Sequence, residues 1–111
     1  MVVELRVYTL KAGNRPAFQA RFEGQILPML ERFGVKVVAA SPSLHDADSF
    51  CLVRAFPSAE GRELQIEQFY GSEEWLTSHD AEVMAMIDHY STCVIEADEE
   101  PLASLFEGLQ S

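Results

Sequence analysis

The sequence predicts an α+β protein whose elements follow the order β-α-β-β-α-α-β, the ferredoxin-like split βαβ arrangement. Three patterns support this class. Residues 2–13 open with apolar and polar side chains in alternation, residues 18–33 carry apolar side chains at steps of three and four, and residues 49–56 are largely apolar on both sides. These patterns are typical of a strand, an amphipathic helix and a central strand. The arrangement places a four-stranded antiparallel sheet against helices on one face only.

The opening strand has two chemically different faces. Val3, Leu5 and Val7 point one way, and we expect this side to pack in the core. The opposite side carries Glu4, Arg6 and Tyr8. An acid, a base and an aromatic side by side require a partner surface or a pocket. The strand ends at the turn formed by residues 11–13.

The first helix is expected between a cap at Asn14 and a stop at Gly34. Its buried stripe consists of Phe18, Phe22, Ile26, Met29, Leu30 and Phe33. Gly24 and Pro28 interrupt it, because proline inside a helix removes a hydrogen bond and clashes with the preceding turn. We therefore predict a kink near residues 24–28.

A long-looped hairpin is predicted next, with strands at residues 35–40 and 49–56 joined by a polar loop. One face of the later strand carries Cys51, Val53 and Ala55, and the other carries Phe50, Leu52, Arg54 and Phe56. A strand that is apolar on both sides is expected at the centre of the sheet.

Two further helices and a last strand complete the fold. Ser58 caps a helix that ends at Gly71, with Leu64, Phe69 and Tyr70 directed inward. Ser72 caps the next helix, whose inward positions are Trp75, His79, Val83, Met86, Ile87 and Tyr90. Residues 92–97 form the fourth strand.

We place one domain at residues 1–100, followed at 101–111 by an amphipathic tail with Leu102, Leu105, Phe106 and Leu109 at helical offsets.

The face of the sheet that lacks helices is expected to carry Tyr8, Phe50, Leu52 and Phe56. A monomer does not normally leave such an apolar patch in water. We therefore predict a homodimer in which two sheets meet face to face and close into a barrel with an internal space.

Composition restricts the classes of function. The chain has 111 residues, enough for one domain, and a formal net charge of -10, which argues against binding to nucleic acids or anionic membranes. Cys51 and Cys93 are far apart in apolar runs, so they are expected to be small core residues in a reducing compartment. No basic leader and no apolar run of about 20 residues is present, so a cytoplasmic location is expected.

Glu4, Arg6, Tyr8 and Arg54 form the strongest candidate site, because the first and third strands are neighbours in this fold. One interpretation is an anion- or carbonyl-binding cavity on the barrel side of the sheet, walled by Phe50, Leu52 and Phe56 and suited to a small, partly apolar ligand. The other is a structural ion-pair network in which Glu4 neutralises an arginine, since a buried charge must be paired.

The histidines allow weaker interpretations. His79 lies one turn after Trp75 and can stack on it, and His89 is expected at the end of the third helix as a partner of the helix dipole. His45, Asp46 and Asp48 are better explained by a solvated turn than by a metal site. Because glycine-rich phosphate loops, nucleophile elbows and zinc motifs are missing, no cofactor and no metal are predicted.

Three segments of the chain carry a family resemblance: the opening ELRVYTLKAG at residues 4–13, LPMLER at residues 27–32, and the pair Glu74-Trp75. In these segments the chain resembles the NIPSNAP family of the dimeric α+β barrel superfamily. The chain departs from the family pattern where Ala12 stands in a lysine-proline-glycine turn and where Ser72-Glu73 replaces an aspartate-proline. Neither departure threatens the fold.

The resemblance implies a homodimer but leaves the activity open, since NIPSNAP members mostly lack an assigned reaction. Relatives in the superfamily include cofactor-free monooxygenases, haem-degrading enzymes, chlorite dismutases, muconolactone isomerases and stress-responsive proteins. The leading hypothesis is a small-molecule-binding homodimer. The alternatives are a cofactor-independent monooxygenase or isomerase, a non-enzymatic assembly protein that associates through the C-terminal tail, and a haem-binding protein that uses His79 as axial ligand or base.

Overall fold

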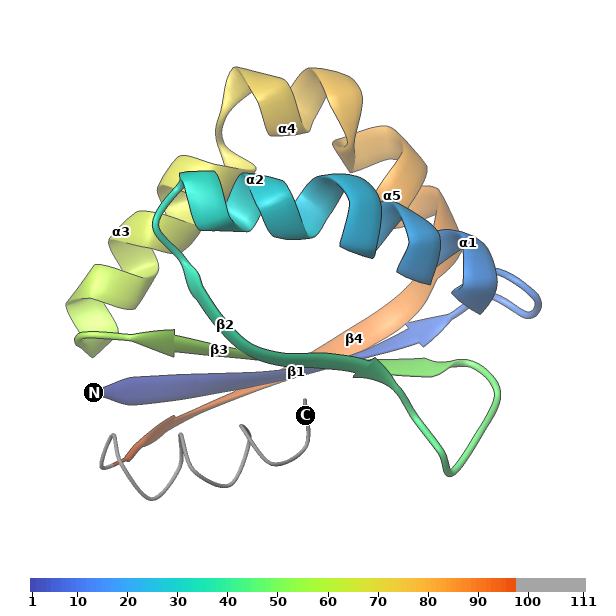
Figure 1. Cartoon of the computed structure of the whole chain (residues 1–111), viewed down its shortest axis with the longest axis horizontal. Coiled ribbons are helices and arrows are strands. Elements are labelled where there is room, and N and C mark those ends of the chain that lie inside the picture. Colours follow the sequence, from blue (N-terminus) through green and yellow to red (C-terminus); the bar gives the residue numbers. More distant parts are fainter. Residues whose placement is uncertain (98–111) are drawn as a thin grey trace.

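The structure, a computed structural model, describes residues 1–97. Four antiparallel strands form one sheet in the order β2-β3-β1-β4, and the helices cover one face of it (Figure 1). The predicted α+β class and strand count are confirmed. The strands are β1 (Val2–Leu10), β2 (Lys36–Pro42), β3 (Ser49–Phe56) and β4 (Ile87–Glu96), and the helices are α1 (Arg15–Arg21), the π-helix η1 (Phe22–Ile26), α2 (Leu27–Arg32), α3 (Ala59–Tyr70), α4 (Glu73–Ser78) and α5 (Asp80–Met86).

The first helical segment is interrupted close to where the sequence predicts it. A π-helical turn, η1, separates α1 from α2, and Pro28 lies in the first turn of α2, where its missing N–H is least costly. Gly34 follows with φ of 77°, a left-handed conformation that favours glycine. The chain can therefore reverse directly into β2.

The helices pack on the face of β1 opposite to the one predicted. Tyr8 and Phe50 lie in the hydrophobic core, and the Phe18 ring of α1 is 5.2 Å from Tyr8 and 5.3 Å from Phe50 between centroids. Leu52 and Phe56 belong to the same core. The expectation that Tyr8, Phe50, Leu52 and Phe56 occupy the helix-free face is therefore wrong.

The face with Val3, Leu5 and Val7 points away from the helices, and Val7 is 42% exposed. A period-two pattern separates two faces but does not say which one meets the helices. The aromatic side chains of β1 and β3 decide the question, because they offer the larger apolar surface to α1.

The inward stripe of α3 also differs from the prediction. Leu64 is 57% exposed, whereas Phe69 is buried and Ile66 and Tyr70 pack against the core. The inward-facing positions of α3 are Arg62, Ile66 and Tyr70, at steps of four residues. Because Arg62 is charged, a pattern of apolar residues alone does not include it.

The third predicted helix is shorter than its periodicity suggests. It breaks at His79 into α4 and α5, and residues 87–90 belong to β4, not to a helix. β4 pairs with β1 from Ile87 to Glu96, so strand pairing overrides the helical spacing of Ile87 and Tyr90. His89 is consequently an exposed strand residue beside Asp88, and its predicted position at a helix end is wrong.

Both cysteines lie on the face of the sheet that points away from the helices. Cys51 pairs with Val7 and is half-buried, and Cys93 pairs with Leu5 and is exposed. The prediction that both are buried core residues is corrected accordingly, because an apolar run does not say which face of the sheet a residue occupies.

The predicted tail at residues 101–111 and the domain boundary at residue 100 lie outside the described residues. Within residues 1–97, no helix is both long and apolar enough to span a membrane.

Candidate functional site

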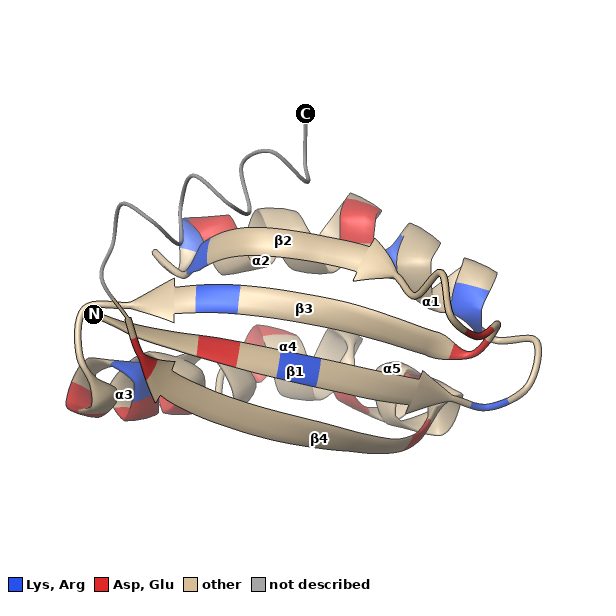
Figure 2. Ribbon diagram, turned by 90° about the horizontal axis from the view of Figure 1, so that it is seen from below, with Lys and Arg blue, Asp and Glu red and all other residues tan. Residues whose placement is uncertain are grey.

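A fully buried carboxylate lies between the sheet and the helices. β1 and β3 pair so that Glu4 stands opposite Arg54, and both side chains have no solvent exposure. The Glu4 Oε1 atom accepts a hydrogen bond of 2.8 Å from Arg54 Nε and a second one from the same guanidinium. This two-point contact holds both groups in one geometry. Figure 2 shows the acidic and basic segments side by side at the centre of the sheet.

Helix α3 supplies a second arginine to the same carboxylate. Arg62 Nε donates to Glu4 Oε2 at 2.8 Å, and Tyr70, two turns later, accepts from Arg54 at 2.9 Å through its hydroxyl. Sequence reasoning missed both residues. Their spacing on one face of α3 with Ile66 was the available signal, since positions 62, 66 and 70 recur every four residues.

The arginines keep Glu4 ionised. Burial alone would raise the pKa of the Glu4 carboxyl, but the charges of Arg54 and Arg6 and the hydrogen bonds from Arg54 and Arg62 lower it below its ordinary value of 4.5. Glu4 therefore serves as the counterion that allows arginine side chains to be buried beneath the helices.

Arg6 is bonded much more weakly than Arg54. It is 8% exposed, its NH1 atom is 3.4 Å from the Tyr70 hydroxyl, and its NH2 atom is 3.6 Å from Glu4 Oε2. Its Nε atom is buried without a hydrogen-bond partner among residues 1–97. The guanidinium carbon lies 5.1 Å from the ring centroid of Tyr90 and 5.7 Å from that of Tyr70. Aromatic faces thus replace most of the polar partners that this cation lacks.

Arg6 lines a cavity of about 470 Å³ between the sheet and the helices α3, α4 and α5. Its volume falls in the range of small-molecule sites. The other lining residues are Tyr8, Ile66, Tyr70, Trp75, Asp80, Val83, Met84, Ile87 and Tyr90. Burial and the neighbouring Tyr70 raise the pKa of Tyr8, so its phenol is neutral at physiological pH.

Asp80 and Trp75 form one side of this cavity. The Trp75 indole Nε1 donates to Asp80 Oδ1 at 3.1 Å, across the break between α4 and α5. The cavity therefore combines a cation and a phenol on the sheet with a carboxylate on the helices. Such a set can bind a polar group and position a proton donor or acceptor.

His79 lies outside this cavity. Its ring is 5.6 Å from that of Trp75, as the predicted stacking requires, but its Nδ1 atom is 3.1 Å from Arg21 NH2 of α1. Burial and the positive charge of Arg21 lower the pKa of His79, so the ring is neutral and accepts this hydrogen bond. The contact joins α1 to the turn between α4 and α5.

Several residues of the predicted site lie behind the cavity and not in its wall. Phe50, Leu52 and Phe56 pack in the hydrophobic core, and Glu4 and Arg54 lie deeper than Arg6. The structure therefore brings Arg6, Tyr8 and Trp75 together at the cavity, while Glu4 and Arg54 support it from below.

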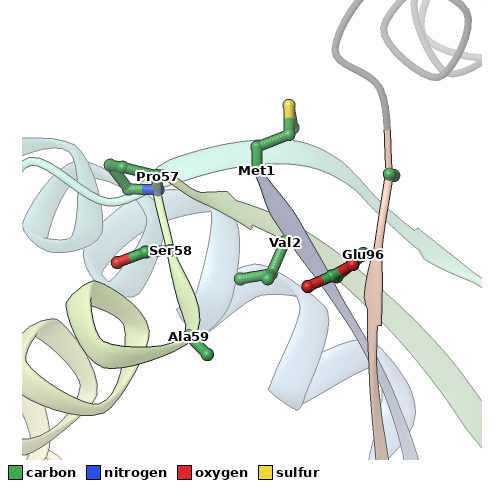
Figure 3. A pocket seen from close by; sticks show the side chains of 7 residues that line it. Met1, Val2, Pro57, Ser58, Ala59 and Glu96 are labelled. Atoms are coloured by element: carbon green, nitrogen blue, oxygen red, sulfur yellow. The ribbon is translucent and has the colours of Figure 1, made fainter.

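A second hollow lies at the far end of the sheet, lined by Met1, Val2, Pro57, Ser58, Ala59, Glu96 and Ala97 (Figure 3). Glu96 is the charged side chain in this lining. Among residues 1–97, this hollow is not lined by an arginine or a lysine, whereas the other cavity is lined by the buried, weakly bonded Arg6.

The loop between β2 and β3 has a structural explanation. Asp46 Oδ1 accepts hydrogen bonds from the backbone N–H groups of Asp48 and Ser49, at 2.8 and 2.7 Å. Arg15 donates to the Asp46 carbonyl at 2.7 Å. These contacts fix a turn. In the part of the chain that the structure describes, no group of three potential metal ligands is found.

We predict that Glu4→Gln lowers the free energy of unfolding by about 3 kcal/mol or more, because removing one partner of a buried ion pair leaves the others uncompensated. The pKa of Glu4 is lowered in the folded state, so its contribution is present above pH 4.5 and is lost as the pH falls through the folded pKa. Urea unfolding at about pH 7 and about pH 3.5 should show the larger difference from the unaltered protein at the higher pH.

The matched control is Glu74→Gln. Glu74 pairs with Arg32 at 2.6 Å on the surface, so its replacement should leave the unfolding midpoint unchanged. Equal stability of Glu4→Gln and the unaltered protein would refute the structural role of the buried carboxylate.

Comparison with known proteins supports the fold. No family model and no curated protein matches the sequence significantly. Among solved structures, a NIPSNAP domain protein from Burkholderia xenovorans has a TM-score of 0.78 and 17% identity, with 90% of this chain and 97% of that chain covered. A NIPSNAP family protein of unknown function from Agrobacterium tumefaciens has a TM-score of 0.79 and 24% identity, with 92% and 93% covered.

A more distant similarity reaches a protein from Nitrosomonas europaea whose assignment as an antibiotic biosynthesis monooxygenase is provisional. Its TM-score is 0.66 at 15% identity, over 87% of this chain and 98% of that chain. A mutant of MhuD, solved with two manganese protoporphyrin IX molecules per active site, has a TM-score of 0.68 at 15% identity, over 87% and 94%. The resemblance drawn from the sequence is thus confirmed at the level of the fold: this chain has the NIPSNAP fold.

Proposed function

We propose that the protein binds a small, partly apolar molecule in the cavity lined by Arg6, Tyr8 and Trp75. The observation that carries this proposal is the weakly bonded Arg6 guanidinium at the wall of an otherwise mainly apolar cavity. Ligand sites are typically apolar hollows with a few polar groups that orient the ligand. The cavity lies between the sheet and the helices of one chain, not on the barrel side where the sequence placed it.

Trp75 provides a direct test, because it is the single tryptophan of the chain and its indole lines the cavity. We expect 2-naphthoate or 2-naphthalenemethanol to shift the indole N–H resonance of Trp75 in a saturable titration. Met84→Phe adds bulk at the half-exposed wall and should weaken binding about fivefold or more, since overfilling a site costs at least about 1 kcal/mol.

The control is Leu76→Phe, because Leu76 is 56% exposed on α4 and is not part of the cavity lining. This variant should bind both probes like the unaltered protein. If neither probe shifts the Trp75 resonance, or if Met84→Phe and Leu76→Phe behave alike, the proposed binding function is refuted.

We also propose that two copies of the chain associate through the sheet faces that point away from the helices. This proposal keeps the homodimer predicted from the sequence but changes the residues at its centre. Val7 and Ile95 are 42% and 44% exposed on this face, and the two cysteines lie beside them. Apolar side chains gathered on a flat sheet favour a self-complementary partner surface.

Sedimentation velocity tests the dimer. The unaltered protein at micromolar concentration should sediment at twice the chain mass of 12.4 kDa. Val7→Glu should give the monomer, because a carboxylate buried between two sheets is unpaired, whereas Leu76→Glu on the helical side should not. A monomeric unaltered protein would refute this part of the proposal.

Proton transfer at a carbon acid is a second candidate function, favoured by the presence of Asp80 and Tyr8 in the same cavity as Arg6. Asp80 would accept the proton from a carbon next to a carbonyl group, the electron pair would move to the carbonyl oxygen, and Arg6 would stabilise that enolate. This chemistry is shared by cofactor-independent isomerases and by monooxygenases that begin with deprotonation.

The test of this candidate uses 2-tetralone in heavy water. The protein should accelerate hydrogen exchange at the ketone's α carbon above the buffer rate, and Asp80→Asn should abolish the acceleration while the Trp75 resonance still responds to the ligand. Exchange at the buffer rate in the unaltered protein would exclude this activity for such ketones. The haem-binding alternative gains no support from the contacts of residues 1–97, since His79 is bonded to Arg21 away from the cavity. The assembly alternative concerns the C-terminal tail, which lies outside the described residues.

A further inference from the structure

We propose that the ligand of the Arg6 cavity is a monocarboxylate with a flat apolar body. This inference rests on the proposed binding function and specifies the chemical class of the ligand. It follows from three features: the charge balance beneath the helices, the difference between Arg6 and Arg54, and the nature of the cavity walls.

The buried network carries more positive than negative charge. Three guanidinium groups, those of Arg6, Arg54 and Arg62, lie around the single carboxylate of Glu4. Among residues 1–97, no other carboxylate comes within ion-pair distance of them. Arg62 is 19% exposed and partly solvated, so the buried groups are two guanidiniums, Arg6 and Arg54, against one carboxylate, an excess of one positive charge. The whole chain has a net charge of -10, which makes this local excess unusual. A buried cation without a counterion is costly, and an anionic ligand would relieve that cost.

Arg6 is the member of the network that is available to such an anion. Arg54 is fully buried, and each of its three guanidinium nitrogens donates a hydrogen bond to Glu4 or Tyr70. Arg6 has one long hydrogen bond of 3.4 Å and a loose ion pair of 3.6 Å, and it lines the cavity. A carboxylate presents two acceptor oxygens, which match the fork of a guanidinium.

The neutral phenol of Tyr8 lines the same cavity and can donate a hydrogen bond to the same anion. The position for an anion is therefore on the floor of the cavity, where β1 supplies both donors.

The remaining walls select the body of the ligand. Tyr70, Tyr90 and Trp75 contribute aromatic surfaces, and Ile66, Val83 and Ile87 contribute aliphatic ones. Aromatic walls favour a flat body that can stack on them. On the helical side, Asp80 adds a negative charge to the lining. A second carboxylate on the ligand would be repelled there, so the site should prefer a single negative charge.

Three two-ring probes of similar size test this inference in the unaltered protein. They are 2-naphthoate, the uncharged 2-naphthalenemethanol and 2,6-naphthalenedicarboxylate, each titrated with the Trp75 indole resonance as the readout. We expect the monocarboxylate to bind about tenfold or more tighter than the alcohol, since a hydrogen bond to a charged group contributes that much to affinity. The dicarboxylate should bind more weakly than the monocarboxylate, and Asp80→Asn should reduce this difference.

Arg6→Met should remove the preference for the carboxylate over the alcohol, and Arg6→Lys should retain part of it. Arg32→Met is the matched control, because Arg32 is 59% exposed on α2 and lies outside the cavity. The preference should be unchanged in this variant. If Arg6→Met does not fold, the comparison of the three probes in the unaltered protein still decides the question.

The possible failures are distinguishable. Equal affinity for the carboxylate and the alcohol would overturn the inferred ligand class and leave the binding function standing. Tighter binding of the dicarboxylate would overturn the preference for a single charge. The absence of any response to all three probes would refute the proposed function itself.

Discussion

The buried ion pair between Glu4 and Arg54 is the contact on which the arrangement of the site depends. It joins the two central strands, both groups are shielded from solvent, and Arg62 extends it to α3. A charge in this position is acceptable only when its partners are fixed, which links the register of the sheet to the position of the helix. The same carboxylate makes it possible to keep Arg6 beneath the helices.

Arg6 and Arg54 show how one network can serve two purposes. Arg54 has short hydrogen bonds and no exposure, as a structural cation requires. Arg6 is a neighbour of the same carboxylate and the same tyrosine but has longer contacts and reaches the cavity. The two interpretations of the charged cluster, ion-pair network and binding site, are therefore compatible. The network holds Arg6 in place. Because the hydrogen bonding of Arg6 is incomplete, its guanidinium is free to bind the proposed ligand.

The two faces of the sheet then have separate roles. The helical face contains the core, the charged network and the cavity, while the opposite face presents Val7 and Ile95 to the outside. In the proposed dimer the cavity belongs to each chain and the interface lies behind it. Successive side chains of β1 point to opposite faces of the sheet. In the proposed dimer, a substitution at Glu4, Arg6 or Tyr8 would therefore affect the cavity side, and one at Leu5 or Val7 would affect the interface.

The sequence by itself determined the class of the fold, the order of its elements and the identity of the chemically unusual residues. Strand and helix periods, the serine caps at 58 and 72 and the glycine at 34 are local signals, and local signals are sufficient for these features. Only the tertiary structure decided which face of β1 meets the helices, because alternation is symmetric with respect to the two sides of a sheet. It also decided that residues 87–90 form part of a strand and not of a helix, because they pair with β1 despite their helical spacing. Arg62 and Tyr70 could not be assigned to the site in advance, since a charge is buried only when distant residues neutralise it, and the chain alone does not show which residues those are.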